Sequence, residues 1–346
     1  MPKMSRPLDV RRGHVDMSHG SGGRAMAQLI EDMFVRNLGN EWLAQGDDAA
    51  VLPSPAAGRW VMATDGHVVS PMFFPGGDVG CLSVHGSIND VAMMGATPLW
   101  LSAAFILEEG LKLSVLERVV QSMAQASRSA GVPIVTGDTK VVERGKGDGI
   151  FITTTCVGVV SGGHTLSGRG ARVGDAVLVS GTLGDHGMAV MVERDGLGFE
   201  SPIVSDTASL HGLVAAMLDS GVELHVLRDP TRGGLATTLN EIATQSQVGI
   251  LLQERAIPVK LAVSAACEFL GLDPLYVANE GKLVAICAGA HVDRLLAVMR
   301  SHPLGVDAAV VGHVQEDPRH LVQMITKLGG RRVVDWLSGE QLPRIC

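Results

Sequence analysis

The sequence predicts an α/β (α+β) protein of two domains, each with a mixed sheet packed by helices, followed by a flexible C-terminal tail. The chain of 346 residues is long enough for two ordinary hydrophobic cores. These cores must rest on aliphatic side chains, because 46% of the residues are hydrophobic but only 3% are aromatic. The 43 glycines suit many tight turns, and helix-like and strand-like segments alternate, which is typical of α/β architectures.

In the first half, a polar stretch and a glycine run precede a helical pattern, and Thr- and Val-rich or apolar runs bounded by turn residues indicate strands. Leu82, Ile88 and Val91 recur on one side of a second helix, and Ser114 is the expected N-cap of a third. The predicted helices are 24–35, 78–95 and the segment after Ser114. The predicted strands are 60–65, 99–107, 134–136 and 150–160.

A glycine-dense join at 161–175 separates this half from a second one with the same alternation. The predicted strands there are 176–180, 249–253, 283–288 and 308–314. The predicted helices are 185–194, 207–220, 233–245, 262–270 and 292–300. The predicted organisation is an N-terminal segment (1–40), a first domain (41–162), a C-terminal α/β domain (163–316) and a tail (317–346).

Charge and cysteine usage exclude several classes of protein. A net charge of −8 without a Lys/Arg run argues against nucleic-acid binding. Neither a signal core nor an apolar run that could span a bilayer is present, so no membrane association is expected. The five cysteines contain no CxxC pair, which argues against a zinc site or a disulfide framework and favours a cytoplasmic location.

The last residue, Cys346, is a candidate nucleophile. A thiol at a chain end can reach other active sites, since ends are usually mobile and Gly329 and Gly330 loosen this one further. Arg344 favours the reactive thiolate. A disordered chain end that happens to stop at cysteine would explain the tail sequence equally well.

Acidic residues of the first half fall at predicted turns or inside a helix. Asp47 and Asp48 lie in a tight turn, and Asp65 ends a predicted strand. Asn89 and Asp90 lie in the predicted helix 78–95, whereas Asp138, Thr139 and Lys140 follow the predicted strand 134–136. Each alone is explained by ordinary turn chemistry. Several carboxylates at strand ends together suit Mg²⁺ held between carboxylates and substrate phosphates.

Two glycine segments could supply the phosphate contacts. One is formed by Gly20, Ser21, Gly22 and Gly23 at the start of a helix, where main-chain N–H groups could face an anion. The other, 229–234, contains Asp229, Thr231, Arg232 and Gly233 and opens the predicted helix 233–245. Neither matches a P-loop or a dinucleotide fingerprint, and a flexible linker also explains the first.

These motifs, with 87–96 (SINDVAMMGA), 279–282 (NEGK) and the terminal Pro-Arg-Ile-Cys, resemble those of a known superfamily. It is the ATP-binding superfamily of aminoimidazole ribonucleotide synthetase, selenophosphate synthetase and thiamine-monophosphate kinase. Within it, nearly the whole chain resembles the HypE family of hydrogenase maturation proteins. The resemblance implies ATP and Mg²⁺ as cofactors. The implied metal ligands are Asp48, Asp65, Asp90 and Asp229, with Asp47 and Asp138 as second candidates.

The resemblance also implies the reaction. In this family, the carbamoyltransferase HypF loads a carbamoyl group on the terminal cysteine, here Cys346. The protein then dehydrates this group to a thiocyanate with ATP, and the cyanide passes to iron on the HypC–HypD scaffold for [NiFe] hydrogenase. The resemblance also implies that 41–162 is the ATP-binding and dimerisation domain, with dimerisation through its sheet and 150–160 as the candidate strand.

Dehydration of an amide needs a good leaving group, which phosphorylation of the carbamoyl oxygen provides. Charge stabilisation and a base for the amide protons are then required. Lys140 is the candidate charge stabiliser, Glu280 the candidate base and Arg232 a ligand for phosphate or for the tail carboxylate. A surface role for Lys140 and a turn role for Glu280 remain alternatives. The rival functions are a small-molecule kinase or synthetase of the same superfamily and a non-catalytic thiol carrier.

Overall fold

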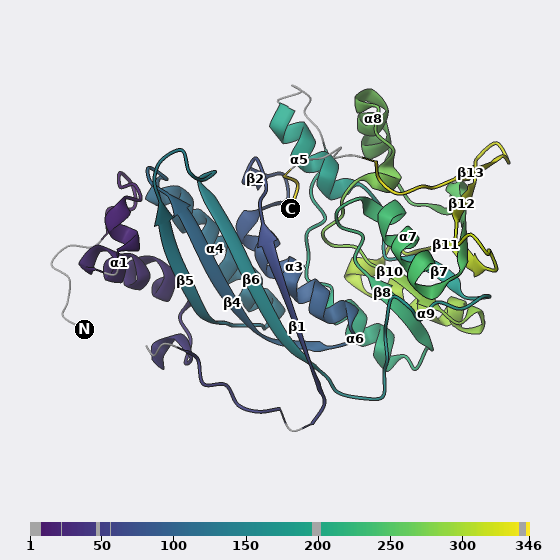
Figure 1. Ribbon diagram of the computed structural model, residues 1–346, viewed down its shortest axis with the longest axis horizontal. Helices are drawn as coiled ribbons and strands as arrows, with labels where there is room; N and C mark the ends of the chain where they lie inside the picture. The colour runs from purple at the N-terminus through teal and green to yellow at the C-terminus, as the bar shows by residue number, and fades with distance from the viewer. Residues whose placement is uncertain (1–7, 22, 46–48, 56, 196–201, 339–343) are drawn as a thin grey trace. The chain divides into compact units, whose positions relative to one another are not determined.

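The computed structural model describes residues 8–21, 23–45, 49–55, 57–195, 202–338 and 344–346 (Figure 1). The chain forms two compact units. Unit 1 comprises Met1–Val68, Asp78–Ser87 and Pro98–Val159. Unit 2 comprises Val69–Gly77, Ile88–Thr97 and Val160–Cys346. Among the described residues, no helix combines the length and the apolar character needed to cross a membrane.

Unit 1 contains a four-stranded sheet in the order β1-β6-β4-β5. The strands are β1 (Arg59–His67), β4 (Thr97–Glu108), β5 (Ile134–Val142) and β6 (Ile150–Val160). Strands β4 and β5 are parallel, as expected because helix α4 (Leu113–Ala130) connects them. Its N-cap is Lys112 and not the predicted Ser114, which lies inside the first turn. The helix ends at Gly131, whose φ of 68° suits glycine.

An N-terminal group of helices covers part of this sheet. It consists of η1 (Met17–Gly20), α1 (Arg24–Leu29), the π-helical turn η2 (Ile30–Val35) and α2 (Arg36–Leu38), followed by η3 (Leu43–Gln45). The Phe34 ring contacts the Phe105 ring of β4 at 4.7 Å between centroids. The predicted helix 24–35 is therefore confirmed and extends to Leu38.

Helix α3 (Val79–Met93) follows the short strands β2 (Phe73–Phe74) and β3 (Gly77–Asp78). Leu82, Val84, Ile88 and Val91 are all fully buried. A helix with most of its side chains buried carries no clear amphipathic stripe, which explains its mixture of small and apolar residues. Its first part belongs to unit 1 and its last part to unit 2.

Unit 2 contains a seven-stranded mixed sheet in the order β13-β12-β9-β11-β7-β10-β8. The strands are β7 (Ala176–Val179), β8 (Leu224–Arg228), β9 (Gly249–Gln253), β10 (Val284–Cys287), β11 (Ala309–Gln315), β12 (Val322–Ile325) and β13 (Arg331–Val333). Strands β9 and β12 are parallel, whereas β10 and β11 both run antiparallel to β7.

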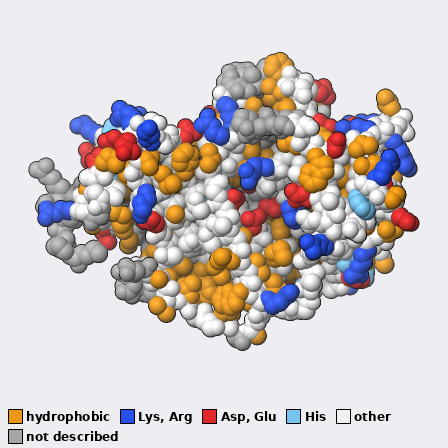
Figure 2. Space-filling model, viewed as in Figure 1, with side chains coloured by type: hydrophobic (Ala, Val, Ile, Leu, Met, Phe, Trp, Pro, Cys, Tyr) orange, Lys and Arg blue, Asp and Glu red, His pale blue; other side chains and the backbone are white. Residues whose placement is uncertain are grey.

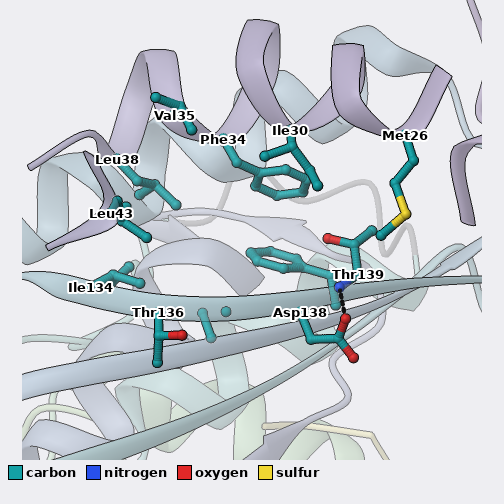
Figure 3. A pocket seen from close by; sticks show the side chains of 13 residues that line it. Met26, Ile30, Phe34, Val35, Leu38, Leu43, Ile134, Thr136, Asp138 and Thr139 are labelled. Carbon is teal, nitrogen blue, oxygen red and sulfur yellow. Dashed lines mark hydrogen bonds between the residues drawn. The ribbon is translucent and has the colours of Figure 1, made fainter. Parts of the chain in front are cut away.

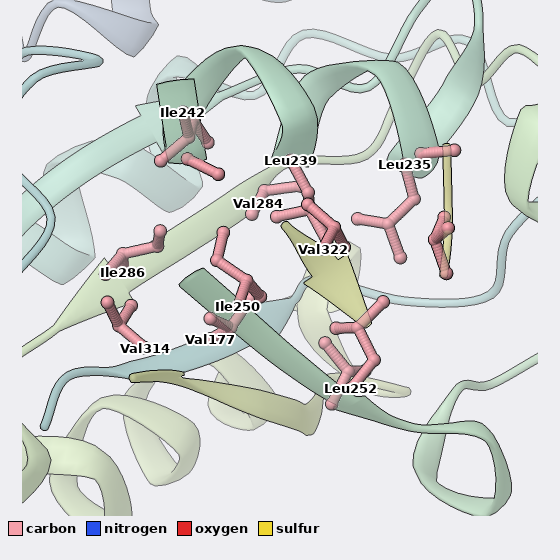
Figure 4. Close-up of a cluster of buried hydrophobic side chains, with 14 of the residues drawn as sticks. Val177, Leu235, Leu239, Ile242, Ile250, Leu252, Val284, Ile286, Val314 and Val322 are labelled. Carbon is pink, nitrogen blue, oxygen red and sulfur yellow. The ribbon is translucent and has the colours of Figure 1, made fainter. Parts of the chain in front are cut away.

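Helices cover both faces of this sheet. Helix α7 (Gly234–Ser246) packs Leu235, Leu239 and Ile242 on the face that carries Ile250 and Val284 (Figure 4). The opposite face, with alternate residues of the same strands, packs against α6 (His211–Asp219) and α9 (Val292–Ser301). Helices α5 (Asp185–Asp195) and α8 (Leu261–Leu270) share a smaller cluster. The short helices η4 (Glu254–Ala256), η5 (Pro274–Tyr276), η6 (Gly289–His291) and η7 (Pro303–Gly305) lie in the connections.

Three elements of unit 2 differ from the sequence prediction. Strand β8 was not predicted, because the apolar run Leu224–Arg228 is short and is interrupted by His225. Strands β12 and β13, which lie within 317–346, were not predicted either. Helix α6 begins at His211 and not at residue 207.

Candidate active site

Asp65 and Asp138 lie inside strands and not, as predicted, at strand ends. Asp65 lies within β1, which continues to His67. Asp138 lies within β5, which continues to Val142 because β4 pairs with it as far as Glu108. An apolar pattern predicts only the first residues of β5, since the residues that follow are mainly polar and mostly exposed or partly exposed.

Asp138 and Lys140 form an ion pair on the exposed face of β5. The Lys140 Nζ lies 2.6 Å from Oδ2 of Asp138, and both side chains are more than half exposed. The hydrogen bond from Lys140 lowers the pKa of the Asp138 carboxyl. Thr139 between them is buried, and its N–H donates to Oδ1 of Asp138 at 2.8 Å. Lys140 is therefore a surface cation with its own carboxylate partner.

The first glycine segment lies against the same strand. A Cβ on Gly20 would lie only 2.8 Å from the main-chain nitrogen of Val141, so this close approach requires glycine. The Ser21 hydroxyl donates to the Ser18 carbonyl, and Gly23 is the N-cap of α1. The structure thus brings Gly20 and Ser21 beside the strand of Asp138 to Lys140. Gly22 lies outside the described residues.

A mainly apolar cavity of about 140 Å³ lies between the N-terminal helices and strands β4 and β5 (Figure 3). Ile30, Phe34 and Val35 approach it from the helical side, and Asp138 and Thr139 lie at its strand side. The cavity has room for a small apolar group beside the polar strand.

Asp65, a predicted metal ligand, lies partly exposed beside a buried histidine. It is 38% exposed, its Oδ1 accepts from the Gly66 N–H at 2.9 Å, and its Oδ2 lies 3.9 Å from Nε2 of the buried His67. The His67 ring also contacts the Thr154 hydroxyl. Asp47 and Asp48 lie outside the described residues. The part of the chain that is described contains no group of three or more His, Cys, Asp or Glu side chains arranged around a metal.

In unit 2, the second glycine segment forms a tight turn at the start of α7. Gly233 and Gly234 have φ of 77° and 59°. A Cβ on Gly234 would lie 2.5 Å from the Leu275 carbonyl oxygen, so the turn needs glycine there. Arg232 is exposed, and the Thr231 N–H donates to the Asp229 carbonyl. The turn therefore presents its polar residues at a helix N-terminus.

Asn279 joins this turn to the segment of Glu280. Its side chain is fully buried and donates to the carbonyls of Pro230 at 2.9 Å and Val277 at 3.0 Å, while its Oδ1 accepts from the Gly184 N–H at 2.8 Å. Glu280 is buried as well, at 4% exposure. The solvated turn that was the alternative for Glu280 is thereby excluded.

The Asn89 side chain, which also belongs to unit 2, forms hydrogen bonds with the Glu280 segment. Its amide nitrogen donates to the carbonyls of Ala208 and Glu280, and its Oδ1 accepts from the Leu210 N–H. Both functional groups of this buried side chain are thus bonded to the main chain. Asp90, on the next position of α3, and Asp229 are partly buried.

Sequence reasoning missed Asp206. Its side chain is 3% exposed, its Oδ1 accepts from the Glu280 N–H at 3.0 Å, and its Oδ2 lies 3.5 Å from Nζ of Lys282. A Cβ on Gly281 would collide with the main-chain oxygen of Asp206, which explains the glycine of this motif. Asp206 sits in an irregular segment without a motif, so no local signal marks it.

The last residues of the chain lie on unit 2, beside β2 and α5 (Figure 1). Ile345 is buried at 2% exposure and forms an antiparallel bridge with Val69. His186, which was not selected from the sequence, contacts the Ile345 carbonyl with Nε2 at 2.8 Å. Cys346 is partly exposed and is not in a disulfide.

Comparisons with known proteins agree with this architecture. The family of AIR synthase related proteins matches with its N-terminal domain at residues 46–160 and its C-terminal domain at 172–325. A carbamoyl dehydratase HypE of Cupriavidus necator is 67% identical over 99% of this chain and 97% of its own length. The carbamoyl dehydratase HypE of Escherichia coli is 46% identical over 96% of this chain and 99% of its own.

Solved structures give the same result. A crystal structure of the hydrogenase maturation protein HypE in complex with ATP has a TM-score of 0.92 and 51% identity, over 95% of this chain and 99% of that one. A HypE–HypF complex has a TM-score of 0.79 and 47% identity, over 89% and 99% of the two chains. With both AIR synthase related domains present and relatives this similar over nearly its whole length, the chain belongs to the HypE family of carbamoyl dehydratases.

Proposed function

We propose that the chain dehydrates a carbamoyl group carried on its own Cys346, using ATP and Mg²⁺, and so supplies cyanide for hydrogenase maturation. The observation that carries the proposal is the position of the C-terminus on unit 2. A chain of contacts runs from the Ile345 carbonyl through His186 to Ser205, whose neighbour Asp206 bonds to the Glu280 main chain. These contacts connect the tail to the segment that contains the proposed base, Glu280.

The proposed reaction has two steps. The carbamoyl oxygen attacks the γ-phosphorus of ATP and ADP leaves, while one N–H proton passes to water. The C–O bond then breaks, phosphate leaves and Glu280 takes the second N–H proton, which gives the thiocyanate. The carbamoyl group loses the atoms of one water, and one ATP becomes ADP and phosphate. Glu280 is assigned as the base because its carboxylate is buried away from bulk water and lies in the segment that the tail contacts lead to.

The other roles are proposed from side-chain chemistry. Lys140 neutralises charge on the transferred phosphoryl group, and Arg232 binds phosphate or the terminal carboxylate. The nucleotide contacts are assigned to Gly20, Ser21, Gly23, Asp138, Thr139, Thr231 and Gly233, with Gly22 and Asp47 outside the described residues. Asn89 was predicted as a nucleotide contact as well. We assign it instead to positioning Glu280, because its side chain is bonded to the main chain of Ala208, Leu210 and Glu280.

Hard carboxylate oxygens fit Mg²⁺, and its ligands are proposed as Asp65, Asp90 and Asp229 with Asp48, which lies outside the described residues. The partly exposed side chain of Asp65 has room for such an ion. Bound Mg²⁺ would supply charge stabilisation at the phosphates.

The proposed partners follow the relatives. One related structure is a HypE–HypF complex, and we assign HypF as carbamoyl donor and HypC–HypD as cyanide acceptor, in the cytoplasm. A homodimer through the sheet of unit 1 is favoured by exposed apolar side chains at Trp60, Met62 and Ile106, at 53%, 72% and 43%. Figure 2 shows hydrophobic side chains gathered over this sheet.

Intact mass spectrometry tests the function. Carbamoylated protein incubated with Mg-ATP should lose the mass of one water, and Cys346→Ser protein should neither carry the carbamoyl group nor lose mass. ATP turnover with a small-molecule acceptor that persists in Cys346→Ser would instead indicate a kinase. The absence of ATP binding would indicate a thiol carrier.

A further inference from the structure

Asp206 holds the segment of Glu280 by its main chain. Its side chain is 3% exposed, and Oδ1 accepts from the Glu280 N–H at 3.0 Å. The main chains of the two segments touch, since a Cβ on Gly281 would collide with the carbonyl oxygen of Asp206 and would lie 3.0 Å from the Ala208 nitrogen. Neither Asp206 nor Glu280 lies in a helix or strand. This side-chain bond therefore contributes directly to the position of Glu280.

The second oxygen of Asp206 faces a buried lysine. The Nζ of Lys282 lies 3.5 Å from Oδ2 of Asp206, and the Lys282 side chain is 14% exposed. Within the described residues, Oδ2 accepts no hydrogen bond, so the ammonium counters its charge through the ion pair. The Lys282 stem lies over Gly181, where a Cβ would be 3.0 Å from Cε. Gly181 therefore leaves room for a lysine at this buried position.

The location of this pair indicates a role other than stability. A buried ion pair contributes little net stability, because the desolvation of both charges offsets their attraction, whereas either charge alone is costly. Asp206 and Lys282 lie beside Glu280, whose carboxylate is also buried. An uncompensated charge on Asp206 would disfavour the ionised form of a second buried carboxylate. Lys282 is placed to cancel that effect.

We propose that Asp206 and Lys282 act together as a positioning pair for the proposed base, in which Asp206 fixes the main chain of Glu280 and Lys282 cancels the charge of Asp206. The catalytic part of this inference rests on the proposed function, because only there does Glu280 take a proton. The compensation of the two charges depends on no reaction. Both are positioning residues, since they act through Glu280 and not on the reacting atoms.

Single-turnover water loss from the carbamoylated protein, followed by intact mass spectrometry, tests the pair. Lys282→Met should slow water loss about tenfold or more, because Asp206 keeps an uncompensated charge. Asp206→Asn should slow it by about the same factor, since the amide oxygen can still accept from the Glu280 N–H but the unpaired ammonium makes a nearby carboxylate a weaker base. The double variant carries neither charge and should come within about threefold of the wild-type rate. Lys282→Arg keeps the charge and should retain most of the rate.

His186 gives a second readout that needs no reaction. Its ring is fully buried and contacts the Ser205 hydroxyl and the Ile345 carbonyl. Burial lowers the pKa of His186, and the negative charge of Asp206 opposes this effect. In an NMR titration, with the ring assigned by its absence from His186→Gln, this pKa should rise by about one unit in Lys282→Met and fall in Asp206→Asn. An unchanged pKa in both variants would overturn the charge compensation.

Asp273 and Arg332 provide a matched control, because Asp273 combines the same two contacts at a more exposed position. Its Oδ1 accepts from the Leu275 N–H at 3.0 Å, and its Oδ2 lies 2.6 Å from Nη2 of Arg332. The two side chains are 33% and 40% exposed. Asp273→Asn and Arg332→Met should leave both the rate of water loss and the His186 titration unchanged. Urea unfolding of every variant sets a temperature at which all are assayed in the folded state.

The outcomes separate this proposal from the proposed function. A double variant as slow as the single variants would show that the two side chains only stabilise the fold, and would overturn the positioning role. Equal rates in all variants, with water loss intact, would refute the pair alone. Absence of water loss in the wild-type protein, together with opposite shifts of the His186 pKa in the two single variants, would refute the proposed function and leave the charge compensation standing.

Discussion

Replacement of Asn279 by alanine tests how the site of unit 2 is built. Its side chain satisfies the Gly184 N–H and the Val277 carbonyl, both of which would lose this partner in Asn279→Ala. The Pro230 carbonyl would keep the bond from the Asn279 N–H at 3.1 Å. Two buried groups without this partner cost about 1–3 kcal/mol each, so the free energy of unfolding should fall by about 2–6 kcal/mol.

Asn240 provides a matched control, because it is also buried in unit 2 and its amide donates to the carbonyls of Ala236 and Val334. Asn240→Ala should cost about 1–3 kcal/mol, since mainly the Val334 carbonyl loses its partner. Urea unfolding measures both costs, and single-turnover dehydration at a temperature where both variants are folded measures activity. Only Asn279→Ala should lose activity by more than tenfold, because only Asn279 joins the turn at Pro230 to Glu280. A loss below about 1 kcal/mol, or equal activity of the two variants, would refute this reasoning.

Two further predictions concern charge and thiol reactivity. Lys140→Ala should abolish dehydration but should change the melting temperature by less than about 2 °C, because exposed ion pairs contribute little to stability. The pKa of the Asp138 carboxyl, followed by NMR, should rise. Full activity or an unchanged pKa would contradict the assigned role. Cys267 and Cys287 have pKa values raised by burial to about 11 and about 12. Since only about a thousandth or less of these thiols is ionised at pH 8, their alkylation should be negligible there and should rise about tenfold per pH unit until each pKa. Rapid labelling of either at pH 8 in folded protein would contradict the burial.

The sequence predicted most elements whose signal is local. The strands 150–160 and 249–253 have the predicted bounds, because Thr- and Val-rich or apolar runs end at glycine or polar residues on both sides. Strand β8 and the strands after residue 317 were missed, since their short runs gain stability from sheet pairing and not from their own pattern. The bounds predicted for the domains stay predictions.

Some residues of the candidate site could also be predicted from local sequence, whereas others could not. Gly233, Gly234 and Glu280 stood in motifs that could be found by reading along the chain. Asp206 and His186 could not, because each lies in a local sequence without a motif and gains its role only from a partner distant in the chain, Glu280 for the first and Ile345 for the second. The hydrogen bonds that hold Asp206 and His186 in place form only when distant parts of the chain come together in the folded protein.

The central claim is that Cys346 carries the carbamoyl group that becomes a thiocyanate. Infrared spectroscopy of protein loaded with a ¹³C-labelled carbamoyl group tests it most directly. The account predicts a C≡N absorption that appears only with Mg-ATP, shifts with the label and is absent from Cys346→Ser. ATP consumption without this band in the labelled wild-type protein would contradict it.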